Sequence, residues 1–162
     1  MKIAFYKGTR TGLQGLVNRA IRWWTNGPYS HVELVFGLAG QTENIWLCAS
    51  SSGIDGGVRF KAMSLSPERW DIVDIDDIFA NRMVAADFFT RHEGALYDFW
   101  GIFGFVWRRA MGSSKRWFCS EAVAASLQID DPWRFDPNTL YVIILALKNK
   151  GTKGDAALVA RD

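Results

Sequence analysis

The sequence predicts an α+β fold. Segments of alternating polar and apolar residues and segments with helical spacing both occur, and no repeat, linker or low-complexity stretch divides them. The chain has 162 residues, of which 49% are hydrophobic and 22% charged, a composition typical of a globular domain with a buried core. We therefore expect a single domain over residues 1–162.

The first segments of the chain predict a strand and then a helix. Residues 2–7 (KIAFYK) mix β-branched, aromatic and apolar side chains and end at Gly8, which favours a strand. An amphipathic helix of about 14 residues follows, with Thr11 as N-cap and its end at 26–28 (NGP). Its apolar residues at helical spacing, expected to face inward, are Leu13, Leu16, Val17, Ala20, Ile21 and Trp24.

Residues 29–36 (YSHVELVF) predict a strand with two different faces. Alternation places Val32, Leu34 and Phe36 on one face and His31, Glu33 and Val35 on the other. A turn over 37–44 and a second strand over 45–50 (IWLCAS) complete a hairpin.

The remaining segments add strands and helices. Residues 58–61 and 70–75 predict strands, while 76–91, 97–109 and 118–127 have helical spacing. The continuous apolar run 140–147 (LYVIILAL) predicts a central strand buried on both faces.

Composition and termini exclude several classes. A formal net charge of +2 without a polybasic tract argues against nucleic acid as a partner. The N-terminus has no secretory signal pattern, and the longest apolar stretch, 99–107, is roughly half of the ~20 residues that a membrane helix needs. These features predict a cytoplasmic protein, although export by another route stays open.

Cys119 is the candidate nucleophile. It stands at the predicted start of a helix, where free N–H groups and the nearby Lys115 and Arg116 would favour a thiolate and hold a developing oxyanion. The plain alternative is a buried cysteine that acts as a small apolar residue.

A thiolate needs a base, and the chain has two histidines. His92 stands at a helix end, where it complements the helix dipole, so we assign it a structural role. His31 is the remaining candidate, although a structural role is open for it too. Glu33 could orient its imidazole, but same-strand neighbours stand about 6–7 Å apart, so a cross-strand residue such as Ser50 or Cys48 is geometrically easier.

The order of these motifs resembles a known family. A His on an early strand (YSHVELVF), then GALYD at 94–98, then FCSEAVAASL at 118–127 and DPNTL at 136–140 resemble the circularly permuted NlpC/P60 proteins of the YiiX/YebB type. These are papain-like cysteine hydrolases, related in layout to lecithin–retinol acyltransferase-like enzymes, and some relatives look like phage or prophage proteins. The resemblance implies an antiparallel sheet or partial barrel packed against helices, one of which carries the nucleophile at its N-terminus.

The resemblance also implies roles for individual residues. Cys119 matches the nucleophile, His31 the base and Tyr97 a tyrosine near the site. The family often carries an acid on the strand after the His strand, but this chain has 47–49 (LCA) there. Either Glu33 or Ser50 takes that role, or the site is weakened.

Other ligand classes receive little support. Two Cys and two His without metal-ligand spacing do not indicate zinc, and a disulfide between Cys48 and Cys119 is not expected. The stretch 53–57 (GIDGG) is a turn, because the lysine and following helix of a phosphate loop are absent. Most of the eight Trp should fill the core, while Trp23, Trp100 and Trp107 could line a groove for an apolar or cell-wall ligand.

The sequence hypothesis is a thiol hydrolase or acyltransferase that uses Cys119 and His31 on an amide or ester bond. Tyr97, Ser50 and Trp100 are the candidate substrate-binding residues, and no cofactor or metal is expected. The resemblance implies a peptide, cell-wall or lipid-derived substrate, and a membrane surface is a further partner without direct support. The alternative is a non-catalytic binding or structural domain on the same fold.

Overall fold

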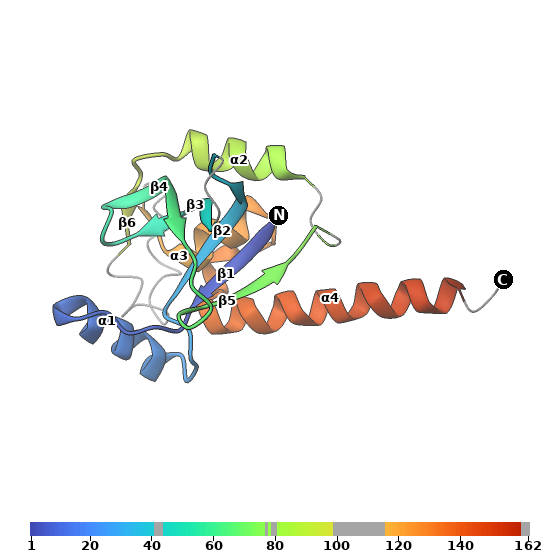
Figure 1. The fold of residues 1–162 in the computed structure, drawn as a ribbon, viewed down its shortest axis with the longest axis horizontal. Helices are drawn as coiled ribbons and strands as arrows, with labels where there is room; N and C mark the ends of the chain where they lie inside the picture. Colours follow the sequence, from blue (N-terminus) through green and yellow to red (C-terminus); the bar gives the residue numbers. More distant parts are fainter. Residues whose placement is uncertain (41–43, 77, 79–80, 99–115, 160–162) are drawn as a thin grey trace.

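One seven-stranded sheet organises the protein. The computed structural model describes residues 1–40, 44–76, 78, 81–98 and 116–159 (Figure 1). The sheet order is β5-β1-β2-β3-β4-β6-β7, and its neighbours are antiparallel except for the parallel pair β6–β7. The strands are β1 (Lys2–Tyr6), β2 (His31–Leu38), β3 (Ile45–Ser52), β4 (Gly57–Ser64), β5 (Trp70–Asp74), β6 (Leu96–Tyr97) and β7 (Arg116–Trp117). The sheet is thus mixed, not wholly antiparallel, and it curls into a half-barrel.

Four α-helices accompany the sheet in the described residues. They are α1 (Gly12–Trp24), α2 (Arg82–Arg91), α3 (Cys119–Ser126) and α4 (Pro137–Val159), with a short 3-10 helix, η3 (Pro132–Arg134), before α4. Helix α3 packs on β2 and β3, and α2 packs against α3 and β4. Figure 1 shows α1 beside one end of the sheet and α4 extending beyond the other elements. The α+β class is therefore confirmed.

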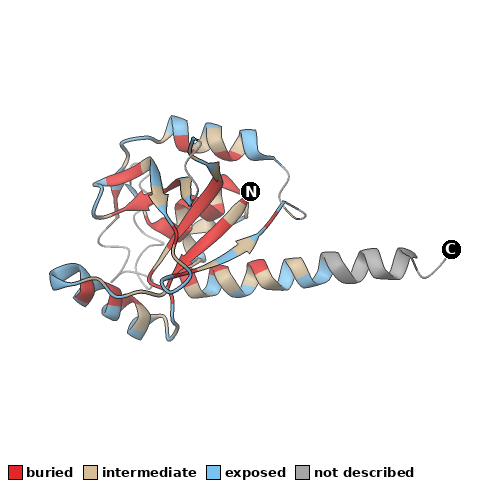
Figure 2. Ribbon diagram, viewed as in Figure 1, coloured by how far each residue is buried: buried red, intermediate tan, exposed pale blue. Residues whose placement is uncertain are grey.

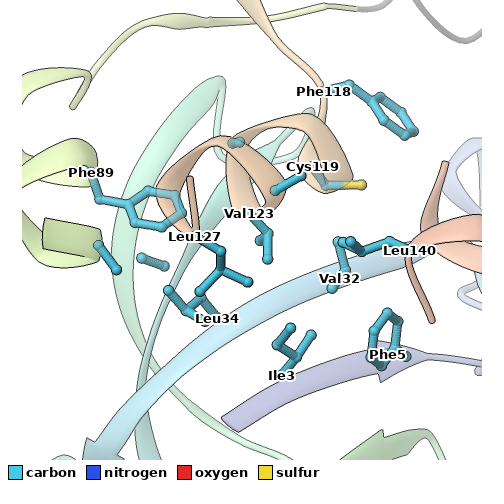
Figure 3. Packing of buried hydrophobic residues seen from close by; sticks show 14 of the residues in the cluster. Ile3, Phe5, Val32, Leu34, Phe89, Phe118, Cys119, Val123, Leu127 and Leu140 are labelled. Carbon is cyan, nitrogen blue, oxygen red and sulfur yellow. The ribbon is translucent and has the colours of Figure 1, made fainter. Parts of the chain in front are cut away.

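The two sheet faces bury separate apolar clusters. Val32, Leu34 and Phe36 belong to the large cluster, which also contains residues of α2, α3 and α4. Figure 3 shows Val32 and Leu34 beneath Cys119, Val123 and Leu127. Val35 belongs to a smaller cluster on the opposite face, with Tyr6 and Trp70 among its members. The alternation predicted for 29–36 is confirmed, because a strand directs successive side chains to opposite faces.

The prediction of a central strand over 140–147 is wrong. These residues form the first half of α4, where only Leu140 and Ile144 are fully buried and Val142 is 63% exposed. A spacing of four residues places Leu140 and Ile144 on one helix face. An apolar run of this length does not by itself distinguish a strand from a helix. The helix start is marked instead by Asp136 and Pro137.

The predicted helix 11–24 exists, but its predicted inward face is wrong. Leu13, Leu16 and Trp24 are exposed, and the buried residues are Gly15, Asn18 and Ile21. Ile21 is the single member of the predicted apolar set that is fully buried. The helix therefore packs through the side that carries Gly15, Asn18 and Ile21.

Other predictions differ mainly in length. Strands β3 and β4 run on to Ser52 and Ser64 and pair along their whole length, and α2 begins only at Arg82, after its cap Asn81. The predicted helix 97–109, with Trp100 and Trp107, lies outside the described residues from Phe99 onward. In the part that is described, no helix is both long and apolar enough to cross a bilayer.

Candidate functional site

Strands β2 and β3 separate at the end that carries His31. Their last paired residues are Leu34 and Ala49, although β2 begins at His31 and β3 continues to Ser52. Side chains fill the opening: the Ser50 hydroxyl donates to the Val32 carbonyl oxygen at 2.7 Å. On the side of β3, Val32 therefore meets the Ser50 side chain, while on the other side it pairs with Phe5 of β1.

The segment before α3 enters the same region. The Ser51 hydroxyl donates to the Trp117 carbonyl oxygen at 2.7 Å, which fixes the chain two residues before Cys119. The Glu121 carboxylate accepts the Phe118 N–H at 3.1 Å and so caps the helix start. Cys119 is the first residue of α3, as predicted, and Figure 3 shows it above the strand that carries Val32.

The Cys119 thiol is fully buried, with no exposed surface. Burial raises its pKa, hydrogen bonds from the backbone of Val32 and Ser120 offset part of this effect, and the Glu33 charge raises it again. The resulting pKa is about 12, so the group is a neutral thiol at pH 7. A helix N-terminus is not enough here to give a free thiolate.

His31 and Glu33 contact one another directly. The His31 Nε2 lies 2.8 Å from Glu33 Oε1, and the carboxylate is fully buried. The expectation that a cross-strand partner is easier is wrong for this pair, because the two side chains on one face lean together. Cys48 lies opposite Val35, so it is not a partner of His31.

Arg59 completes this buried network and was missed by sequence reasoning. Its guanidinium donates to both Glu33 oxygens at 2.7 and 2.6 Å and to Asp55 at 2.9 Å. Burial alone would raise the pKa of Glu33, but the hydrogen bonds and positive charges of Arg59 and His31 lower it to about 2. A charged residue inside a predicted strand, here 58–61, is the signal that could have indicated a buried partner.

His31 directly precedes Val32 in β2, and Cys119 lies in the same buried cluster as Val32. The His31 ring packs edge-on against Trp70, 6.3 Å between centroids, on the sheet face opposite the cluster that contains Cys119. The backbone of Val32, the residue after His31, lowers the pKa of the Cys119 thiol, so this backbone lies near the sulfur. Among the described residues, the His31 ring contacts Glu33 and Trp70, and the two candidate groups lie on opposite faces of β2.

The other candidates occupy different surroundings. Tyr97 is buried, pairs with Trp117 through β6 and β7, and packs its ring 5.8 Å from that of Phe118. Trp100 lies outside the described residues. His92 ends α2, where its Nδ1 lies 2.8 Å from the Phe88 carbonyl oxygen.

Within the residues that the structure describes, no group of three or more His, Cys, Asp or Glu side chains could hold a metal ion. Comparison with known proteins finds no matching family model, curated protein or solved structure.

Proposed function

We propose that the protein is a thiol hydrolase or acyltransferase whose nucleophile is Cys119. One observation carries the proposal: a buried cysteine at a helix start packs in one cluster with Val32, directly after a histidine held by a buried, ionised carboxylate. Nucleophile, base and orienting acid are the three parts of a catalytic triad. Glu33, held by Arg59, supplies the acid that is missing from the following strand.

The chemistry would proceed in two steps. His31 takes the proton of the Cys119 thiol, and the sulfur attacks the carbonyl carbon of an amide or ester. Backbone N–H groups at the start of α3, with the Tyr97 hydroxyl, would bind the oxyanion. The imidazolium returns its proton to the leaving amine or alcohol. Water, deprotonated by His31, then breaks the thioester, or a second acceptor takes the acyl group.

Glu33 would keep the imidazole ready for this role. Its Oε1 holds Nε2, so the other ring nitrogen, Nδ1, is the one left to act as the base. A carboxylate with a pKa of about 2 stays charged at neutral pH and stabilises the imidazolium. Since the thiol itself has a pKa of about 12, base assistance is needed for attack.

A non-catalytic role is the second candidate, and the complete burial of Cys119 favours it. In that case Cys119 fills the core, and the network of His31, Glu33 and Arg59 only stabilises the sheet. The two candidates predict different reactivities for the two cysteines.

Acylation by a chromogenic ester, with the adduct located by peptide mass spectrometry, separates them. Cys48 is the matched control, because its pKa is also raised to about 12, mainly by burial, and it lies on the other sheet face. We expect an acyl adduct on Cys119 and none on Cys48. His31→Gln should slow the acylation by about 100-fold or more.

The thermal melting curve of each variant establishes that it is folded. An unmodified Cys119 in folded wild-type protein would overturn the proposal, as would an unchanged acylation rate in His31→Gln. Cys48→Ala should leave the rate as it is in the wild type.

A further inference from the structure

Helix α1 turns its apolar face away from the protein. Leu13 is 77% exposed, Leu16 59%, Trp24 50% and Trp23 80%. In Figure 2 much of this helix, beside the end of the sheet, has the colour of exposed residues. Residues 13, 16, 17 and 24 fall on one side of a helix, and Val17 is 39% exposed, so these side chains form an apolar strip along α1.

The opposite side of α1 fixes this orientation. Asn18 donates to the Ser30 hydroxyl at 2.8 Å, and Arg22 donates to the carbonyl oxygens of Lys7 and Gly8 at 2.7 and 3.0 Å. A side chain at Gly15 would meet the carbonyl oxygen of Arg10 at 2.0 Å, so the helix packs closely there. The apolar strip is therefore held outward by specific contacts.

The charges around the strip have one sign. Residues 7–24 contain four basic residues and no acidic residue. Lys7 pairs with Asp71 and Arg22 lies on the inner side of α1, which leaves Arg10 and Arg19 near the strip. Arg10 and Arg19 line a hollow of about 550 Å³ together with Thr9, Thr11 and Leu16. Cations and hydroxyls at the border of an apolar strip match the phosphates of lipid headgroups above acyl chains.

We propose that α1 docks the protein on the surface of an anionic lipid bilayer. Leu13, Leu16 and Trp24 would enter the boundary between headgroups and acyl chains, where tryptophan is favoured. Arg10 and Arg19 would contact lipid phosphates. A second copy of the chain fits less well, because a symmetric pair of these helices would bring like charges together.

Flotation of the full chain with vesicles tests this proposal. Vesicles of equal parts phosphatidylglycerol and phosphatidylcholine are compared with vesicles of phosphatidylcholine alone. We expect wild-type protein to float with the anionic vesicles and to be released by high salt. Leu13→Gln with Leu16→Gln should weaken binding by about tenfold or more, and Arg10→Gln with Arg19→Gln should remove the preference for anionic lipid.

Met83→Gln on α2 is the matched control, because Met83 is 82% exposed, like Leu13, but lies on another helix. It should bind as the wild type does. Wild-type protein that stays unbound, or a Leu13/Leu16 double variant that binds normally, would overturn the proposal. So would a dimer, detected by light scattering, that this double variant abolishes, because a second copy would then cover the strip.

Discussion

Glu33 is the fully buried carboxylate of the candidate site. Its side chain is fully buried, yet it accepts hydrogen bonds from Arg59 at both oxygens and contacts His31. A buried carboxylate is tolerated only where such partners compensate the loss of water. The ionised form is therefore part of the folded state, whatever the site does.

The substitution Glu33→Gln tests whether the ionised carboxylate stabilises the folded state. The folded-state pKa of about 2 is below the ordinary 4.5, so the stabilisation is fully present above pH 4.5 and is lost as the pH falls toward 2. The shift corresponds to roughly 3 kcal/mol. Urea unfolding between neutral and acidic pH should show a lower free energy of unfolding at pH 7 for the variant and a weaker decline on acidification.

Asp87→Asn is the control, because Asp87 forms an exposed pair with Arg91 on α2. Exposed pairs of this kind contribute little, so its acid dependence should match the wild type. If Glu33→Gln retained the wild-type acid dependence, the buried network would not be its source.

At the scale of elements, the alternation of polar and apolar side chains predicted structure better than the apolar content of a segment did. The alternation in 29–36 correctly predicted the two faces of β2, because a strand has a strict period of two. The run 140–147 has no such period, and its apolar content fits a strand or a helix equally. The buried side of helix α1 was predicted wrongly for a different reason. Its apolar side is exposed, so amphipathic spacing alone did not identify the side that is buried.

The candidate site was predictable only in part, because some of its contacts depend on how the strands pair. Cys119 was correctly placed at a helix start from its own sequence neighbourhood. The contacts of Arg59 with Glu33 and of Ser50 with Val32 depend on strand pairing and on the separation of β2 and β3. No local pattern shows where two strands separate.

Asp136 is the local signal that starts α4. Its carboxylate accepts the N–H groups of Asn138 and Thr139 at 2.8 and 3.1 Å, and it also accepts the Thr139 hydroxyl. Asp136→Ala should lower the free energy of unfolding by about 1 kcal/mol, because these N–H groups lose their acceptor. Asp136→Asn keeps an acceptor oxygen and should recover most of the loss in urea titrations. Equal losses in both variants would contradict the capping role.

At the scale of the whole molecule, Asn138 joins distant parts of the chain. Its side-chain oxygen accepts the Tyr29 N–H, and its amide donates to the Tyr29 carbonyl oxygen, both at 2.9 Å. The same amide donates to the Thr25 hydroxyl at 2.7 Å. A side chain on Gly27 would meet Asn138 at 2.3 Å, so the connection between α1 and β2 is fitted to this residue.

Asn138→Ala should therefore affect both stability and the candidate site. Removing the amide leaves the N–H and carbonyl of Tyr29 without this partner, at a cost of about 2–3 kcal/mol in urea unfolding. Asn81→Ala is the matched control: it makes the same chemical change at a local cap, where the Asn81 side chain accepts only the Val84 N–H, and should cost about 1 kcal/mol. Because Tyr29 leads directly into the strand end that carries His31, we expect Asn138→Ala also to slow ester acylation of Cys119, measured under conditions where the variant is folded. If Asn138→Ala lost only as much stability as Asn81→Ala and kept the wild-type acylation rate, α4 would not help to hold the start of β2.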